Sequence, residues 1–599
     1  MLKNRVYGLF FILIFLVCGP VAAEDNSGFK LEPIVVSKAK VHLSSAYSVR
    51  YDTAGDLPAD SPVETLGITP VDLQSRSLKE GIQTDFSLRG STFQGVLMLL
   101  SGQRINDPQT AHHNSDLPFT SQDLERIEVI PGAGSSVFGP DAMGGAINFQ
   151  VKKPQERKLF LELKGGEYRT GSVLFSASDK INNIGARISV ENAQSGGFKP
   201  DTDFRKFTSN LTSSVDLPNG AFNLNFGYQE KEFGAFDFYT PGSKYESKEW
   251  TKTFLLNTGL VLEKEGLTIK PNFLWRRHFD KFLLDKTLQR STYRNDHRTD
   301  MFTPNIYFQK DAGIIGKAGL GLEYGQELIR SSNLGKHIRE HQSIFLDDSK
   351  DLPGNLSLGA SFRFDDFSTF DGVNTGSLAL KYSLNDFNSF NLGVSRSMRI
   401  PSFTELYYSD PTTLGDANLS AESALNYQAG YDFKSSRVAY NGTFFFRQEK
   451  DVIDWVKHSP SQAKWQVENI TSDKVLGFEN NIKLKLNKIA DLNAGYTYVN
   501  KNINESGLIY KYGPNYTKHL FNSALIFHLP FGAQELGFVY KKKPGRGGWF
   551  LLSMRLSYDI NRNSQVFFEG TNLGNVDYEE IEGIPQPGRW LEGGVRLQW

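Results

Sequence analysis

The chain has 599 residues, more than one compact soluble core usually contains, so we expect several domains or an extended architecture. Its 66 basic and 67 acidic residues nearly cancel, which argues against a nucleic-acid-binding protein.

Residues 1–23 have the pattern of a secretory signal peptide. Basic residues precede an apolar run, Leu9 to Val17, and small residues follow at Val21-Ala22-Ala23. The apolar run is too short to span a bilayer. Removal of this segment also removes the only cysteine, Cys18, so we expect a mature chain without disulfides.

Residues 41–154 combine strand-like apolar runs with glycine-rich turns, a pattern that predicts a mixed α/β domain. The runs are Val96 to Leu100 and Arg126 to Ile130. Three short motifs follow one another here: Ser87-Leu88-Arg89-Gly90, then Glu125-Arg126-Ile127-Glu128-Val129-Ile130, then Gly139-Pro140-Asp141-Ala142-Met143-Gly144-Gly145-Ala146-Ile147-Asn148.

Residues 155–599 are a succession of segments with a period of two, separated by polar stretches that contain Gly and Pro. Phe222, Leu224 and Phe226, for example, alternate with Asn223 and Asn225. A soluble β-sandwich also alternates, but it seldom continues over so long a range. At about 20 residues per strand and connection, the range suits a transmembrane β-barrel of about 22 antiparallel strands, a size whose lumen must be plugged.

The connections between these segments are unequal in length. A short one, Leu217 to Gly220, is expected on the periplasmic side. Long polar ones are expected on the extracellular side: Gly234 to Lys248, Asp280 to Thr299 and Pro401 to Glu422.

The three ordered motifs, the barrel-like segments and a last strand in which Val595, Leu597 and Trp599 share one face resemble the TonB-dependent outer-membrane transporters. The resemblance implies an outer-membrane β-barrel with an N-terminal α/β plug domain in its lumen, and a transporter rather than an enzyme. In one departure, Pro131-Gly132-Ala133-Gly134 stands where the family usually has Arg or Lys followed by Gly-Pro. The resemblance also implies a small-molecule substrate, contact with outer-membrane lipid, assembly by the barrel-assembly machinery and a monomer.

The segment 24–40 contains a β-prone peptide, Leu31-Glu32-Pro33-Ile34-Val35-Val36-Ser37. In isolation such a run is most often an ordinary edge strand. In this family its place before the plug resembles a TonB box, which adds a strand to the TonB-type inner-membrane energiser. Pro33 lacks an N–H and must point away from the paired edge.

The barrel segment Arg399 to Tyr407 is similar to signatures of vitamin B12 and siderophore receptors, and Phe236 to Ser243 looks like an extracellular loop of cobalamin receptors. The resemblance is closest to the vitamin B12 branch, which implies import of cobalamin or a related corrinoid. A ferric-siderophore or haem receptor is the alternative within the fold. A passive porin is the alternative of another class, although a porin needs neither a plug nor a TonB box.

The plug loop Asn106 to Asp116 is rich in hydrogen-bonding groups, which suit a large polar ligand held by many contacts. Considered singly, His112 and His113 are more often exposed loop histidines than metal ligands. We expect substrate contacts from the following plug and barrel residues: Asn106, Gln109, Thr110, His112, His113, Asn114, Asp116, Phe238, Tyr239 and Tyr407.

Charged residues suggest two further kinds of contact. Arg89 and Arg126 are expected to pair with barrel glutamates, of which Glu422 and Glu569 are the plausible partners. The alternative for Arg126 is a solvated side chain at a strand end. Asp201 and Asp203 fall where cobalamin receptors carry calcium-binding aspartates. Because Ca²⁺ prefers six to eight oxygen ligands, a solvated acidic loop is the stronger interpretation of these two residues.

Overall fold

The structure is a computed structural model that describes residues 47–50, 61–76, 79–132, 134–240, 242–288, 294–313, 316–503 and 507–599. The chain divides into two units, Met1–Pro33 and Ile34–Trp599, and all described residues belong to the second. The predicted signal peptide and the predicted TonB box, Leu31 to Ser37, lie outside the described residues.

The first described part of the chain is built on a mixed sheet with the strand order β1-β6-β7-β4-β5. Its strands are β1 (Tyr47–Arg50), β4 (Val96–Leu100), β5 (Gln103–Arg104), β6 (Leu124–Pro131) and β7 (Gly145–Val151). Strand β4 pairs with β7 in parallel and has no exposed side chain, as its continuous apolar run predicts for a strand covered on both faces.

Short elements surround this sheet. They are the hairpin β2 (Asp72–Ser75) and β3 (Thr84–Ser87), the 3-10 helices η1 (Glu64–Ile68), η2 (Phe93–Gly95), η3 (Ala111–Ser115) and η4 (Ser121–Asp123), and the helix α2 (Ser135–Phe138). No helix among the described residues is long and apolar enough to cross a membrane.

In the described residues, 22 long antiparallel strands form a closed barrel. They are β8 (Lys158–Gly166), β9 (Thr170–Ile181), β10 (Ile184–Ser195), β11 (Phe204–Leu217), β12 (Gly220–Gly234), β13 (Lys248–Lys264), β14 (Leu267–Leu283), β15 (Arg294–Asp311), β16 (Lys317–Ser331), β17 (Gly335–Leu352), β18 (Leu356–Phe367), β19 (Val373–Ser383), β20 (Asn388–Arg399), β22 (Glu422–Lys434), β23 (Val438–Lys457), β24 (Trp465–Lys485), β25 (Ala490–Ile503), β27 (His519–Leu529), β28 (Gly532–Lys542), β29 (Gly548–Asn561), β30 (Ser564–Thr571) and β33 (Trp590–Gln598). The predicted fold class is therefore confirmed.

Smaller elements decorate the connections of the barrel: η5 (Glu167–Arg169), α3 (Phe403–Tyr407), β21 (Thr413–Leu414), β26 (Ile509–Tyr510), β31 (Glu579–Ile581) and β32 (Ile584–Pro585). The predicted boundary between plug and barrel, at 154/155, falls between β7 and β8 and stays a prediction.

The barrel closes where its last strand meets its first. Strand β33 pairs with β8, and the backbone of Trp599 exchanges hydrogen bonds of 2.8 and 2.9 Å with Leu159. Closure leaves no strand edge without a partner, which is the condition for a sheet that crosses hydrocarbon.

The alternating pattern of the strands separates an apolar outer face from a polar inner face. On neighbouring strands β11 and β12, Leu211 and Phe226 are 42% and 38% exposed, whereas Asn210 and Asn225 are buried. Large apolar side chains are thus exposed while polar ones are covered, the reverse of a soluble protein and the arrangement expected of a membrane barrel.

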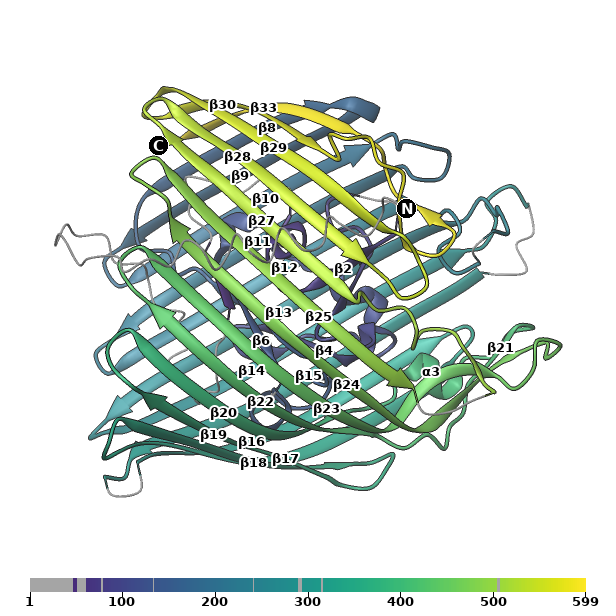
Figure 1. Ribbon diagram of the computed structural model, residues 1–599, viewed down its shortest axis with the longest axis horizontal. Coiled ribbons are helices and arrows are strands. Elements are labelled where there is room, and N and C mark those ends of the chain that lie inside the picture. The colour runs from purple at the N-terminus through teal and green to yellow at the C-terminus, as the bar shows by residue number, and fades with distance from the viewer. Residues whose placement is uncertain are drawn as a thin grey trace, which may run out of the picture. The chain divides into compact units, whose positions relative to one another are not determined.

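Connections on the two ends of the barrel differ in length. Because consecutive strands are antiparallel, the short connections such as 218–219 and 265–266 lie at one end, and the long ones 235–247, 400–421 and 572–589 lie at the other. Figure 1 shows α3 and β21 beyond the strand ends, opposite the side on which the C-terminus lies. This end is called the long-connection end below.

The mixed sheet and its surrounding elements contact the inner face of the barrel on several sides. Plug residue Met98 packs in one buried cluster with Leu255 and Leu274 of the wall. Elsewhere, Asn522 Nδ2 of β27 donates to the Thr69 carbonyl at 2.7 Å. Since these wall strands are far apart around the barrel, the plug occupies its lumen.

Candidate functional site

The predicted ligand loop, Asn106 to Asp116, connects β5 towards β6 and carries η3. Thr110 caps η3 by accepting a hydrogen bond from a backbone amide, and Asn114 Oδ1 accepts from the Asp107 amide at 3.0 Å. The Asn106 side chain holds the loop to β4, since its Oδ1 accepts from the Met98 amide at 2.7 Å and its Nδ2 donates to the Val96 carbonyl at 3.0 Å. These polar side chains therefore shape the loop itself.

All of the predicted plug-loop residues are buried, so the interpretation of His112 and His113 as exposed loop histidines is wrong. The reason is that the loop lies against the barrel wall, which covers it. The buried set is Asn106, Gln109, Thr110, His112, His113, Asn114 and Asp116.

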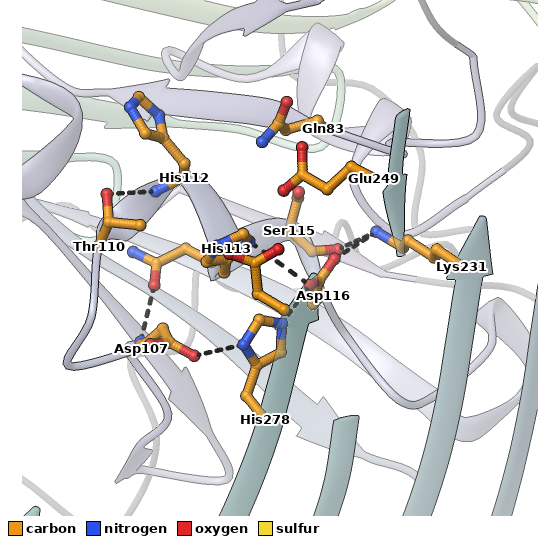
Figure 2. A network of polar contacts seen from close by, with 12 residues as sticks. Gln83, Asp107, Thr110, His112, His113, Ser115, Asp116, Lys231, Glu249 and His278 are labelled. Carbon is orange, nitrogen blue, oxygen red and sulfur yellow. Dashed lines mark hydrogen bonds and ion pairs between the residues drawn. The ribbon is translucent and has the colours of Figure 1, made fainter. Parts of the chain in front are cut away.

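Aspartates of the loop are clamped to the wall by charge (Figure 2). Asp107 pairs with Arg276 of β14, and Lys231 Nζ of β12 lies 2.8 Å from Asp116 Oδ1. His278 joins the two aspartates: its Nδ1 is 3.1 Å from Asp107 Oδ2 and its Nε2 is 2.7 Å from Asp116 Oδ2. Paired in this way, the carboxylates stay ionised although they are buried.

His113 belongs to the same charged layer. Its Nε2 lies 3.4 Å from Asp280 Oδ2, to which Gln109 Nε2 also donates at 3.1 Å. Burial alone would lower the pKa of His113, but nearby carboxylates, with Asp280 foremost, outweigh burial and raise the pKa to about 10. His113 is therefore a cation at neutral pH.

His112 has the opposite character. Burial and, to a smaller extent, Arg76 lower the pKa of His112 to about 4. Asp85, whose Oδ1 lies only 2.7 Å from the ring Nδ1, raises the pKa but does not offset these effects. The ring is thus neutral, and it stacks on Phe93 with centroids 4.1 Å apart and planes 11° apart.

Around His112 lies a group of half-buried aromatic rings that we call the aromatic face: Phe93, Tyr239 and Tyr512. Phe93 and Tyr512 meet edge to face at 5.1 Å, and the His112 ring lies 6.0 Å from Tyr239. Phe93 comes from η2 of the plug, and the two tyrosines come from connections at the long-connection end. Sequence reasoning missed Phe93 and Tyr512, since neither lies in a motif.

The predicted barrel contacts divide between two roles. The Tyr239 hydroxyl accepts from Gln83 Nε2 at 2.7 Å and lies 3.2 Å from Glu249 Oε2, beside the plug loop. Phe238, in contrast, is buried with Phe204 and Phe233 and serves the packing of the wall.

Tyr407 lies at the end of α3 and stacks on the His337 ring at 3.5 Å. The first turn of this helix docks on the plug loop, because the amides of Phe403 and Thr404 donate to the carbonyls of Pro108 and Gln109 at 2.9 and 3.1 Å. The structure therefore brings α3 to the same plug loop that Tyr239 approaches from another connection.

Arg89 pairs with the barrel, but not with the predicted glutamates. Its Nη2 and Nε lie 2.7 and 3.0 Å from Glu479 Oε2 on β24, and its Nη1 donates to Gln428 at 3.1 Å. The predicted partners are taken by their own cross-strand neighbours, since Glu422 lies opposite Arg399 and Glu569 lies opposite Arg555.

Arg126 makes no pair with a barrel glutamate among the described residues, so that prediction is wrong. Its Nε lies 2.8 Å from Glu128, two residues further on the same face of β6, and its Nη1 lies 3.3 Å from Glu125. The side chain is 21% exposed, close to the alternative of a solvated arginine.

The structure gives no support for a calcium site at Asp201 and Asp203. The Asp201 carboxylate is paired with Lys286. Within the described ranges, neither aspartate belongs to a group of three side chains placed to hold a metal ion.

Comparison with known proteins defines the class. The family described as TonB dependent receptor-like, beta-barrel matches residues 182–573, and the TonB-dependent Receptor Plug Domain matches residues 42–146. The chain belongs to the TonB-dependent receptor family. It is accordingly an outer-membrane protein of TonB-dependent transport, in a family of transporters and receptors that are not enzymes, and it works with a TonB-type energiser and a small-molecule ligand.

Among individual proteins, the chain is 24% identical to the vitamin B12 transporter BtuB of Vibrio vulnificus over 68% of this chain and 67% of that protein. It is 23% identical to the iron-regulated outer membrane virulence protein of Vibrio cholerae over 74% of each chain. Matches to the first relatives thus span about two thirds of their length.

Solved structures show the same fold. The siderophore receptor PirA from Acinetobacter baumannii matches with a TM-score of 0.77 at 13% identity, over 92% of this chain and 98% of that chain. The copper transporter OprC matches with a TM-score of 0.80 at 14% identity, over 92% and 99%.

Proposed function

We propose that the chain imports cobalamin or a related corrinoid across the outer membrane. From the sequence, the resemblance of Phe236 to Ser243 to a cobalamin-receptor loop supports this substrate class, and Arg399 to Tyr407 resembles a segment that vitamin B12 and siderophore receptors share. The vitamin B12 transporters among the curated relatives support it as well.

The observation that carries the proposal is the aromatic face at the long-connection end, which we take as extracellular. A corrinoid is a large, nearly flat macrocycle with polar side chains on its rim. Half-buried rings such as Phe93, Tyr239 and Tyr512 offer flat apolar contact area at little cost in conformational entropy. The neutral, buried His112 ring supports this surface by stacking on Phe93.

The buried plug-loop residues have a supporting role in this proposal. Asn106, Thr110 and Asn114 hold the loop in shape, and Asp116 ties it to the wall. They act on ligand affinity by fixing where His112 and Phe93 lie. We propose the same indirect role for Phe238 and for Tyr407, which positions α3 against the loop.

Calorimetry on the purified protein tests the proposal. Wild type is titrated with cyanocobalamin, ferric siderophores and haem, and compared with Tyr239→Ala and Tyr512→Ala. We expect cyanocobalamin to bind and each substitution to weaken binding at least about tenfold, or roughly 1.4 kcal/mol.

Tyr427→Ala is the matched control, because that tyrosine is 44% exposed on barrel strand β22, away from the aromatic face. It should bind like wild type. Absence of cyanocobalamin binding in wild type refutes the substrate, and unchanged affinity in both aromatic variants refutes the site.

A ferric siderophore is the second candidate. The iron-regulated relative favours it, and the same titration decides between the two, since a ferric siderophore that binds while cyanocobalamin does not would select it.

A further inference from the structure

A second cluster of ligand-type side chains lies beside the charged network, where the plug loop meets three neighbouring wall strands. It consists of His113 of η3, Glu249 near the start of β13, Asp280 near the end of β14 and His297 near the start of β15. All four are buried, with 3%, 0%, 5% and 7% exposure. Figure 2 shows His113 and Glu249 within the layer.

Strand register explains why these residues meet. Asp280 lies directly opposite His297 in the β14–β15 ladder. In the β13–β14 ladder, Asp280 lies opposite Thr251, two residues from Glu249, so that Glu249 is a diagonal neighbour on the same inner face. The plug then adds His113 from the lumen side.

The distances suit a small cation held by nitrogen and oxygen. Ligand atoms of His113, Glu249 and Asp280 all lie within 4.8 Å of one another, and His113 Nε2 is 3.4 Å from Asp280 Oδ2. A tetrahedral Zn²⁺ with ligands at about 2.0–2.2 Å keeps those ligands roughly 3.3–3.6 Å apart. His297 Nε2 lies 4.0 Å from Asp280 Oδ2 and is the candidate for a fourth ligand.

The two carboxylates of this cluster have no lysine or arginine as a partner. In the described part of the chain, neither Glu249 nor Asp280 lies within ion-pair distance of either residue type. The aspartates of the neighbouring network differ, since Arg276 and Lys231 pair with them. Buried carboxylates are costly unless they are paired or coordinate a metal.

Two side-chain atoms of this cluster, Asp280 Oδ1 and His297 Nδ1, are buried without a hydrogen-bond partner. By contrast, the other triad of ligand-type residues, formed by His113, Asp116 and His278, has its carboxylate bonded to Lys231 and His278. Within ion-pair distance, the carboxylates around Asp280 therefore have the His113 ring but no lysine or arginine of the described residues, and a metal ion that binds His113 must displace its proton.

We propose that His113, Glu249, Asp280 and His297 form a binding site for one divalent transition-metal ion of the zinc class. Two imidazoles with two carboxylates favour Zn²⁺ and similar ions over Ca²⁺ and Mg²⁺, which prefer oxygen ligands. Because His113 belongs to the plug and the other ligands to the wall, the bound ion ties the plug loop to the barrel. None of the four ligands is among the proposed corrinoid contacts, although Glu249 Oε2 lies 3.2 Å from the Tyr239 hydroxyl.

Metal titration of the full mature protein in detergent, after treatment with a chelator, tests the site. We expect one equivalent of Zn²⁺ to bind, and Co²⁺ used as a probe to give the intense visible absorption of a four-coordinate ion. Glu249→Gln keeps the shape of the side chain but removes its charge, and His297→Ala removes a ligand from another strand. Each should weaken Zn²⁺ binding at least tenfold.

His458→Ala is the matched control, because His458 forms an exposed pair with Glu468 that is able to collect metal nonspecifically. It should leave the binding unchanged, and heat-modifiable migration on gels confirms that each variant is folded. The proposal is overturned if wild type binds no Zn²⁺, if both folded cluster variants bind it as wild type does, or if Ca²⁺ binds in preference.

Discussion

Arg89 is one of the residues that join the plug to the wall by charge. Arg89 has a positive φ of 50° and is 5% exposed. Its guanidinium forms an ion pair with Glu479 and lies 4.4 Å from the centre of the Phe445 ring. Removing one member of a buried ion pair typically costs about 3–5 kcal/mol, because the other charge is left without compensation.

Glu479→Gln should therefore loosen the plug. We expect hydrogen exchange of plug amides, measured by mass spectrometry, to speed up by a factor that corresponds to about 3 kcal/mol or less of local stability. Glu422→Gln is the control, since Glu422 pairs with Arg399 within the wall. Equal plug exchange in wild type and Glu479→Gln would contradict the anchoring role.

At the residue scale, the sequence predicted that Arg89 forms an ion pair with a barrel glutamate, but it did not predict which glutamate. A motif places Arg89 in the plug and suggests a buried pair, but the choice of Glu479 depends on how a plug turn faces β24. Glu422 and Glu569 were wrong choices because cross-strand register gives each of them an arginine. Such register follows from the lengths of many earlier turns, which a local pattern does not contain.

Among the elements, the last strand has a role in closing the barrel. The Trp599 backbone hydrogen-bonds to Leu159 and so extends the pairing of the last strand with the first. The Trp599 side chain is 58% exposed and contacts no other aromatic ring among the described residues. We propose that the barrel-assembly machinery recognises that group.

Deletion of Trp599 and Trp599→Asp separate these two contributions, since only the deletion removes the backbone hydrogen bonds. Both changes should reduce the folded, heat-modifiable protein in outer-membrane fractions, and Trp599→Phe should restore it. Wild-type amounts of inserted barrel in Trp599→Asp would show that the side chain is dispensable.

Element type was predictable wherever a physical period exists. Alternation along β12 and the continuous apolar run of β4 both predicted the correct strands, because burial on one face or two imposes those patterns. The plug loop has no period. Its hydrogen-bonding composition was evident, but whether those groups face ligand, loop or wall depends on tertiary contacts such as that of Asp116 with Lys231.

At the scale of the whole molecule, the proposed import needs two parts, the aromatic face at the long-connection end and a docking peptide that precedes the plug. Family membership supports the use of a TonB-type energiser. The assignment of Leu31 to Ser37 as the docking strand remains a proposal, as does the monomeric state. If the peptide pairs with the energiser edge to edge, its backbone N–H groups matter for import and not for ligand binding.

Val35→Pro is the substitution that isolates this step, because proline removes one N–H from the proposed ladder. Val35→Ala keeps the N–H and is its control. We expect surface binding of ligand to stay within a few-fold of wild type in both variants, while import fails only in the proline variant.

The most direct test is uptake of radiolabelled cyanocobalamin by cells that express wild type, Val35→Ala or Val35→Pro, with surface binding measured on the same cells. We expect all three to bind cyanocobalamin and only the first two to accumulate it inside cells. Wild-type cells that neither bind nor accumulate cyanocobalamin would contradict the substrate, and accumulation by Val35→Pro at the wild-type rate would contradict the docking strand.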